Sequence, residues 1–199
     1  MKAYVLFCHP TRTSFMGAVL DRTLAALTAC GHQVRLSDLY ADGFRPELDR
    51  NDRAAHLVDH RGAPDRRPDI AAYTDNLAWC DSLILVYPTW WSAQPAMLKG
   101  WFDRVLVRGV AWDLPEGANR IRPLLTNVRT IVGVTSHGSS KFVNSIEGEA
   151  GKRTLSRSLR AMCGLRCRAR WIALYAIDHS TPEQRERFLD RVERRITRL

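Results

Sequence analysis

Two adjacent tryptophans, Trp90 and Trp91, follow an almost continuous apolar run and stand between two prolines in the sequence YPTWWSAQP, residues 87–95. Adjacent side chains on an extended segment point in different directions, so at most one of the two rings enters a core easily. The other is free to form a flat wall against a planar ring system, with backbone N–H groups nearby to bond its heteroatoms. A pair of tryptophans packed in a core or an interface is the alternative interpretation.

A second segment, HPTRTSF at residues 9–15, gathers an imidazole, an arginine and three hydroxyl side chains directly before a predicted helix. Free backbone N–H groups and the positive end of the helix dipole make such a turn a binding place for phosphate. A helix cap by Ser14 needs only one of these residues, so Arg12 and the other hydroxyls favour the phosphate interpretation. The sequence contains no Gly-x-Gly-x-x-Gly pattern, which excludes that dinucleotide-binding fingerprint.

Small polar residues form a third segment, TSHGSS at residues 135–140. Its backbone can approach a ligand closely. Its imidazole, His137, is able to donate a hydrogen bond, shuttle a proton or stabilise charge on a reduced ring. A loop histidine without a functional role is the alternative interpretation.

The apolar pattern alternates between short strand-like runs and longer helical stretches, as in chains built from βαβ units. This alternation predicts a single domain, residues 1–199, with a doubly wound five-stranded parallel sheet of order 2-1-3-4-5 and helices on both faces. The stretch 40–68 reads as a long surface excursion with room for one helical turn, which no periodic pattern holds. We expect strands at 2–8, 33–37, 82–87, 128–135 and 167–177, and helices at 15–29, 69–79, 95–107, 151–163 and 182–199, the first capped by Ser14 and the last by Thr181.

The three polar segments follow the first, third and fourth of these strands. In an open sheet of this order, ligands bind beyond the carboxyl ends of the strands, at the point where the strand order reverses. We therefore expect the three segments to surround one crevice. That shared position carries more weight than the composition of any one segment.

Composition and charge limit the other possibilities. A chain of 199 residues with 45% hydrophobic content is typical of one globular domain, and no apolar run approaches the roughly 20 residues that span a bilayer. Five scattered cysteines predict a reducing cytoplasm rather than a disulfide framework, and Cys163 and Cys167 lack the further ligands of a metal site. The net charge of +9 is interpreted as a solvated basic surface, because no arginine run is interleaved with aromatic residues as in nucleic-acid-binding platforms.

The run PTWWSAQPAMLKGWFDRV, residues 88–105, resembles a signature of the NAD(P)H:quinone oxidoreductase family, in which an aromatic-rich turn precedes Pro-Ala-x-Leu-Lys-Gly-Trp. His9 and residues 13–15 are similar to the family's flavin-phosphate loop, and residues 135–138 are similar to its loop beside the isoalloxazine ring. The resemblance covers nearly the whole chain. It implies a flavodoxin-like fold and ping-pong chemistry, in which NAD(P)H reduces a non-covalently bound flavin and a quinone or similar small acceptor then takes the electrons in the same place.

The resemblance also implies roles for particular residues. His137 is the expected catalytic residue, and Trp91, Trp112 and His137 are the expected contacts of the nicotinamide and the acceptor. The segment GVAW, residues 109–112, is similar to one that supplies an aromatic roof across a homodimer, so Trp112 is expected to cover the partner chain's pocket. The expected flavin-binding residues are His9, Thr11, Thr13, Ser14, Phe15, Pro88, Thr89, Trp90, Trp91, Ser92, Thr135, Ser136, His137, Gly138 and Ser139.

The chain departs from the family pattern in two places. Met16 replaces an asparagine of the mammalian-type members, and residues 142–148 supply neither the tyrosine nor the histidine that those members carry. We expect His137 to replace that function. Relatives bind FAD or FMN, and FAD is the expected flavin. The alternatives to an enzyme are a regulatory subunit of a potassium-efflux system and a flavodoxin-type electron carrier; the basic charge argues against the carrier.

Overall fold

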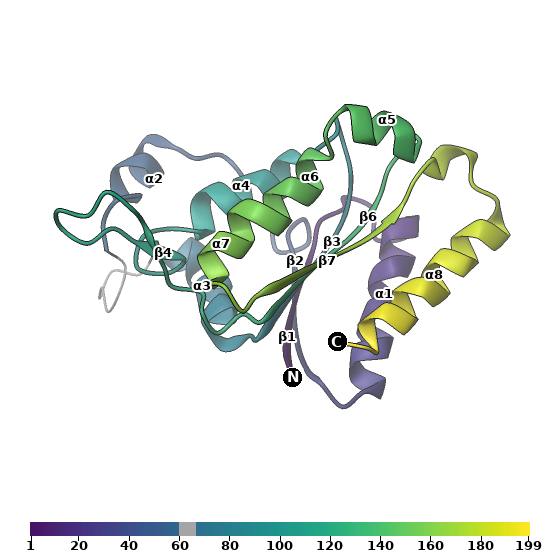
Figure 1. The fold of residues 1–199 in the computed structure, drawn as a ribbon, viewed down its shortest axis with the longest axis horizontal. Coiled ribbons are helices and arrows are strands. Elements are labelled where there is room, and N and C mark those ends of the chain that lie inside the picture. The colour runs from purple at the N-terminus through teal and green to yellow at the C-terminus, as the bar shows by residue number, and fades with distance from the viewer. Residues whose placement is uncertain (60–66) are drawn as a thin grey trace.

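Five parallel strands form the central sheet of the protein, for which a computed structural model describes residues 1–59 and 67–199. The strands lie in the order β2-β1-β3-β6-β7, and each neighbouring pair is parallel. When these five strands alone are numbered along the chain, β6 is the fourth and β7 the fifth, so the order is the predicted 2-1-3-4-5. The doubly wound, flavodoxin-like sheet is therefore confirmed (Figure 1). The strands span Lys2–Phe7 (β1), Gln33–Asp38 (β2), Ser82–Pro88 (β3), Thr130–Ser136 (β6) and Arg168–Leu174 (β7).

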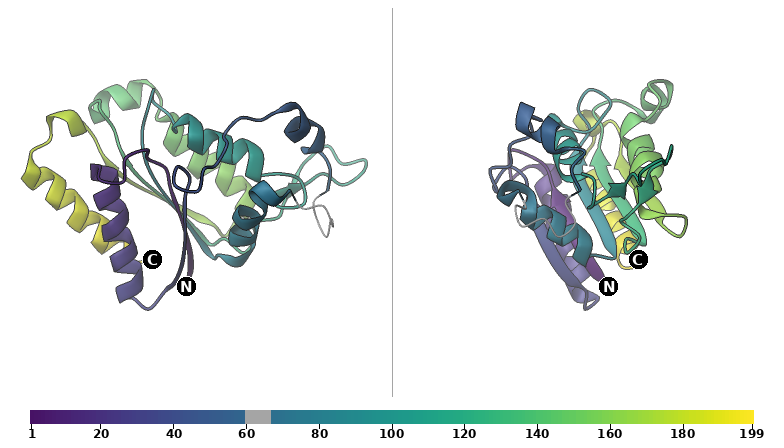
Figure 2. Two further views of the ribbon diagram at one scale, coloured as in Figure 1. Left: turned by 180° about the vertical axis from the view of Figure 1, so that it is seen from behind. Right: turned by 90° about the vertical axis from the view of Figure 1, so that its left-hand side faces the viewer.

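Helices cover both faces of this sheet (Figures 1 and 2). Two helices, α1 and α8, pack together on one face, and the remaining long helices lie on the other. The first layer consists of Phe15–Ala29 (α1) and Pro182–Ile196 (α8). The second consists of Pro68–Trp79 (α3), Ala96–Val105 (α4), and one continuous segment formed by Ala150–Arg153 (α6), the π-helix Thr154–Leu159 (η1) and Arg160–Cys163 (α7).

Alternating residues of the central strands supply the two cores. On β3, Leu83, Leu85 and Tyr87 pack with the layer of α3 and α4, whereas Ile84 and Val86 pack with α1 and α8. All five side chains are fully buried. Successive side chains on a strand point to opposite faces, so a strand covered on both faces must be apolar throughout. This explains the unbroken apolar run that precedes the tryptophan turn.

Capping side chains fix the ends of the two helices on the first face. The Ser14 hydroxyl accepts a hydrogen bond from the Gly17 N–H at the start of α1, which begins and ends where the sequence predicts. Thr181 and Gln184 form a reciprocal capping box at the start of α8. Such caps satisfy N–H groups that have no partner within the helix.

Several other boundaries differ from the prediction. Strand β7 ends at Leu174 instead of residue 177, because Ala176 adopts a left-handed backbone with φ 55° and a short 3-10 turn, Ile177–His179 (η2), follows. Helix α4 is shorter than the predicted 95–107, and the predicted helix 151–163 contains the π-helical turn η1. Propensity and periodicity do not specify such local changes of backbone.

Short elements connect the main ones. The helix Arg50–Ala55 (α2) agrees with the single helical turn allowed for in the stretch 40–68. The sequence does not predict the helix Lys141–Ile146 (α5) or the hairpin of Trp112–Asp113 (β4) with Arg122–Pro123 (β5). Helix α2 lies in the predicted surface excursion, whose residues 60–66 fall outside the described part of the chain. Among the described residues, no helix is both long and apolar enough to cross a membrane.

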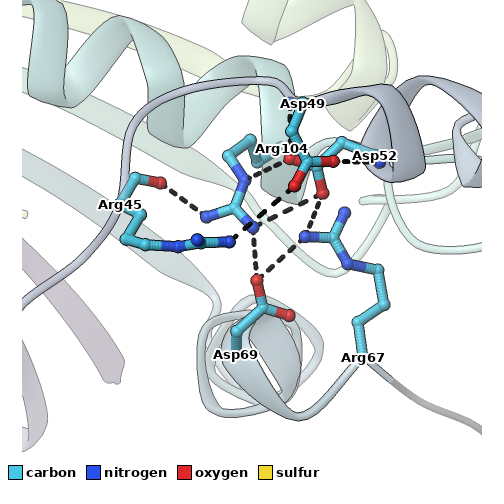
Figure 3. Close-up of polar contacts among 6 residues, drawn as sticks. All are labelled: Arg45, Asp49, Asp52, Arg67, Asp69 and Arg104. Carbon is cyan, nitrogen blue, oxygen red and sulfur yellow. Dashed lines mark hydrogen bonds and ion pairs between the residues drawn. The ribbon is translucent and has the colours of Figure 1, made fainter.

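A buried cluster of ion pairs, rather than any periodic apolar pattern, holds the excursion against α4. The Arg104 Nε donates to Asp52 Oδ2 at 2.8 Å, and both side chains are almost fully buried. Asp69 also binds Arg104, and Arg67 binds both carboxylates (Figure 3). Close to this cluster the backbone touches directly: a Cβ on Gly100 would lie 2.2 Å from the Pro46 carbonyl oxygen.

We predict that Arg104→Met destabilises the protein by about 3 kcal/mol, because it leaves the buried Asp52 carboxylate without its main partner. Urea unfolding followed by circular dichroism measures this change. Lys99→Met on the same helix is the matched control, since it removes only an exposed ion pair with Asp103 and should cost no more than about 0.5 kcal/mol. Equal effects of the two substitutions would contradict the role of the buried cluster.

The same cluster predicts a loss of stability in acid. Burial by itself raises the pKa of Asp52, but hydrogen bonds and charge from Arg104 and Arg67 outweigh it and leave the pKa lowered. Its contribution is therefore present above the unfolded carboxyl pKa of about 4 and is lost as the pH falls below that value. The free energy of unfolding of Asp52→Asn should depend less on pH in this range than that of the wild type. Parallel curves for the two proteins would exclude Asp52 as an acid-sensitive group.

Candidate functional site

The tryptophan pair lies on a tight two-residue turn after β3. Trp90 and Ala93 exchange both backbone hydrogen bonds at 3.1 Å, and the residues between them, Trp91 and Ser92, have φ 48° and 60°. Positive φ at both central residues is the geometry of a type I′ turn, which costs free energy for residues other than glycine and is often found at functional sites. In this turn Trp91 is fully exposed to solvent and Trp90 is 41% exposed, so neither ring enters the core.

Hydrogen bonds and a ring contact bring the three polar segments together. The Thr89 N–H donates to the Ser136 carbonyl at 2.7 Å, which extends the β3–β6 pairing by one residue. The Thr89 hydroxyl lies 3.1 Å from the Thr135 hydroxyl and 3.5 Å from His137 Nε2. In the first segment the His9 ring lies 6.1 Å from the Trp90 ring, measured between centroids. The three segments therefore lie at the same edge of the sheet, with the second and third hydrogen-bonded to each other and the first in contact with the second through the His9 and Trp90 rings.

A pocket of about 610 Å³ opens between the tryptophan turn and the loop after β6. Its size is within the range of small-molecule and cofactor sites. All of its lining residues are predicted site residues except Asn144 and Glu147, which lie on or next to α5. The lining residues are Thr89, Trp90, Trp91, Ser92, His137, Gly138, Ser139, Asn144 and Glu147.

Residues on and next to α5 form hydrogen bonds with both sides of the pocket, the tryptophan turn and the loop after β6. The Ser92 hydroxyl donates to the Glu147 carboxylate at 2.6 Å, and the Asn144 side-chain amide donates to the Ser139 and Ser140 carbonyls. The sequence signal for α5 is the cap Ser140, whose hydroxyl accepts from the Val143 N–H. The apolar residues of α5 give no further signal in the sequence, because the helix does not bury them: Phe142 is 74% exposed.

The first segment presents a helix N-terminus but not a free arginine. The Arg12 guanidinium binds the Asp21 carboxylate and the Gly17 carbonyl, both on α1. The expectation that Arg12 supports phosphate binding is therefore not met by this side chain. Ser14 caps the helix, as in the alternative interpretation, and Thr11 and Thr13 lie exposed beside it. What the segment offers to an anion is the dipole of α1, its unpaired N–H groups and two hydroxyls.

His137 is the most enclosed titratable group beside the pocket. Its side chain is buried, its ring stacks on Tyr175 at 4.6 Å with an interplanar angle of 18°, and its other neighbour is Trp171 at 6.1 Å. Nδ1 has no hydrogen-bond partner among the described residues. Burial lowers the pKa of His137, although the Asn144 side chain and the carboxylates of Glu147 and Glu149 oppose this effect. The imidazole is accordingly held neutral at physiological pH.

A charged network supports the far side of the His137 ring. The Tyr175 hydroxyl donates to the Glu149 carboxylate at 2.8 Å, and Lys152 binds the same carboxylate at 2.7 Å. Sequence reasoning misses both Tyr175 and Glu149, because Tyr175 follows a strand that the apolar pattern extends too far and Glu149 owes its position to a left-handed backbone, φ 45°.

Several predicted site residues do not line this pocket: His9, Thr11, Thr13, Ser14, Phe15, Pro88, Trp112, Thr135 and Ser136. Trp112, on β4, donates its indole N–H to the Leu106 carbonyl at 2.8 Å and packs 5.8 Å from the His56 ring. Its role as the roof of a partner chain's pocket remains a prediction. Cys163 and Cys167 are both buried and free, and residues 1–59 and 67–199 contain no group of three or more metal-ligating side chains.

Comparison with known proteins agrees with this geometry. A family model described as the flavodoxin-like fold matches residues 1–199. The chain belongs to this family. It is also 29% identical to rat NAD(P)H dehydrogenase [quinone] 1 over 212 residues, an alignment that covers 98% of the chain and 76% of the relative. The predicted resemblance to NAD(P)H:quinone oxidoreductases is thus confirmed.

Solved structures give the same result. The NAD(P)H:quinone oxidoreductase from Methanothermobacter marburgensis is 28% identical with a TM-score of 0.80, and the match covers 99% of this chain and 94% of that one. An FMN-dependent NADH-azoreductase from Bacillus anthracis, solved in complex with FMN, has a TM-score of 0.76 and covers 100% and 99% of the two chains. Its identity of 14% shows a shared fold alone.

We predict that His137 titrates below its ordinary pKa of about 6.5 in the folded protein. Because the unfolded state then binds more protons, the buried neutral ring makes the fold less stable as the pH falls below about 6.5. NMR of the histidine Cε1 protons measures the titration, and the chain unfolded in urea gives the reference. A folded-state pKa at or above the unfolded value would contradict the burial of a neutral imidazole.

Proposed function

We propose that this protein is a flavin-dependent NAD(P)H oxidoreductase that transfers a hydride from NAD(P)H, through the flavin, to a quinone or a similar small acceptor. The observation that carries the proposal is the pocket at the carboxyl ends of β3 and β6, which lies between an exposed tryptophan turn and a buried histidine. The relatives named as NAD(P)H quinone oxidoreductases support the same reaction class.

The residues of the site fit a flavin. Trp90 and Trp91 form the wall for a flat ring, and the left-handed residues of the turn, Trp91 and Ser92, both line the pocket. The start of α1, with Thr11, Thr13, Ser14 and Phe15, suits the phosphate end of such a ligand. The remaining proposed contacts are Pro88, Thr89, Ser92, Thr135, Ser136, Gly138 and Ser139, and His9 packs behind Trp90.

The flavin, when bound, supplies the hydride chemistry, and the protein's residues orient the rings and stabilise charge. His137 is proposed to form a hydrogen bond with a partner in the pocket through a ring nitrogen, with its position fixed by Tyr175 and Thr89. Because the imidazole is neutral, it adds a dipole that responds to developing negative charge without a permanent cation. No carboxylate pair or nucleophilic triad is required.

Three finer features belong to this proposal. We propose FAD rather than FMN as the flavin. The ion pair between Arg12 and Asp21 does not itself favour FAD, because it leaves the first segment with fewer contacts for a second phosphate. We also propose a homodimer, since Trp91 on the turn and Phe142 and Ile146 on α5 are exposed apolar side chains that a second chain carrying Trp112 can cover. Five free cysteines favour a reducing compartment, the cytoplasm.

We predict that the purified protein is yellow, or becomes yellow on addition of FAD or FMN, and that anaerobic NADH or NADPH bleaches it. Benzoquinone should then restore the colour, and mass spectrometry of the cofactor released by heat identifies the flavin. A protein that binds neither flavin and transfers no electrons to any quinone would exclude the proposed activity.

Trp91→Ala should weaken flavin binding by about tenfold, or about 1.4 kcal/mol, because the wall of the ring is lost while the turn's backbone remains. Fluorescence titration of the apoprotein with flavin measures the change, and the pH profile of turnover should keep its shape. Leu165→Ala, which removes a 97% exposed apolar side chain in a distant loop, is the matched control and should bind flavin like the wild type. Unchanged flavin affinity in Trp91→Ala would show that the flavin ring does not stack on Trp91.

A further inference from the structure

A groove separate from the pocket runs along β7, the edge strand of the sheet. Three adjoining hollows of about 400, 290 and 70 Å³ form it. The first two share Tyr175 and Arg191, and the last two share Lys152 and Trp171, so the groove is continuous along the strand. No carboxylate lines any of the three hollows. The basic lining residues are Lys141, Lys152, Arg170, Arg187, Arg191, Arg194 and Arg195, with His179 at one end.

Helix α8 separates its charges into two stripes, and this explains the excess of cations in the groove. Glu186, Asp190 and Glu193 recur at i, i+4 and i+7 and all bind Arg22 on α1. Their sequence neighbours Arg187, Arg191 and Arg194 repeat the same spacing one residue later and face the groove. Within the described ranges none of these three arginines has a carboxylate within ion-pair distance.

The cations are also unfavourable to one another. Burial and the charges of Arg195 and Arg194 lower the pKa of Arg191. Its guanidinium donates to the Ala173 carbonyl at 2.5 Å and lies over the Phe188 ring, so neutral groups alone hold it. Of the seven basic residues, Lys152 has a carboxylate partner, Glu149. A negatively charged ligand in this groove would relieve the repulsion.

The strand itself offers unpaired backbone groups along the same groove. The Arg168 N–H donates to the Arg129 carbonyl, and the Leu174 carbonyl accepts from the His137 N–H, both toward the β6 side. In a parallel pair, residues that bond to the neighbouring strand alternate with residues whose N–H and C=O point away. Ala169, Trp171 and Ala173 therefore direct their N–H and C=O groups outward, and of these groups the Ala173 carbonyl is the one that binds Arg191.

We propose that this groove binds an extended, acidic peptide segment of a partner protein, which adds to β7 as a sixth strand of the sheet. Backbone pairing with Ala169, Trp171 and the Ala173 N–H provides the affinity, and the flanking arginines and lysines select acidic side chains. A second copy of this chain is a poor occupant, because its edge carries the same Arg168 and Arg170 and the whole chain has a net charge of +9. A polyphosphate satisfies the cations but is repelled by the outward carbonyl oxygens.

Binding of synthetic peptides to the full-length protein tests the proposal. The probe is a fluorescein-labelled peptide of alternating glutamate and valine, EVEVEVE, measured by fluorescence anisotropy at low and high salt. We expect saturable binding that weakens as the salt concentration rises. The same peptide with alternate residues N-methylated keeps its charge but loses half of its N–H donors, and it should bind at least tenfold more weakly. Absence of binding, or equal affinity of both peptides, would overturn strand addition.

Amide hydrogen exchange followed by NMR locates the bound peptide. Bound EVEVEVE should slow exchange of the outward amides of Ala169, Trp171 and Ala173 at least tenfold, whereas inorganic polyphosphate should leave them unchanged. If polyphosphate competes fully with the peptide and these amides exchange at their free rates in both complexes, the groove is a general anion site and the proposal is wrong.

A pair of double variants separates the groove from overall charge. Arg191→Gln with Arg195→Gln should weaken binding of EVEVEVE about tenfold. Arg50→Gln with Arg120→Gln removes the same charge from exposed positions on α2 and near β5 and should leave binding unchanged. Thermal unfolding of all three proteins checks that they are folded. Equal losses in both double variants would show attraction by net charge alone and contradict a specific site.

Discussion

Strand β3 is buried along its whole length, between α3 and α4 on one face and α1 and α8 on the other. This burial fixes the register of the strand, since a shift of one residue would exchange the side chains of the two cores. Its pairing with β6 then extends beyond the strand, through the Thr89 N–H, to the loop that carries His137. The position of the tryptophan turn relative to the histidine therefore depends on hydrophobic packing at some distance from both.

The pocket combines two different surfaces. On one side, a strained turn exposes Trp91, and the Ser92 hydroxyl ties the turn to Glu147 beside α5. On the other side, His137 is enclosed by aromatic rings and remains neutral. A flat cofactor needs the first surface for stacking and the second for charge stabilisation, and neither surface requires a catalytic acid of unusual strength. The Tyr175–Glu149–Lys152 network holds the histidine ring from behind, and it depends on the left-handed backbone of Glu149.

The sequence predicts the sheet and much of the site because both depend on local patterns. Continuous apolar runs identify the buried strands, and polar segments directly after those strands must meet at one edge. The Asp52–Arg104 pair is not predictable in this way, since it joins residues far apart in the sequence and no periodicity marks Asp52. Asn144 and Glu147 are missed because α5, which carries Asn144 and ends just before Glu147, buries little of its apolar side. The positive φ of Trp91 and Ser92 is equally hidden, because turn propensities favour glycine or asparagine there.

A crystal structure of the protein grown with FAD tests the central claim most directly. The account predicts that the isoalloxazine ring lies in the pocket between the Trp90–Trp91 turn and the loop of His137, with a phosphate at the N-terminus of α1. Electron density for the ring elsewhere, or a flavin-free pocket in a protein that reduces quinones, would contradict it.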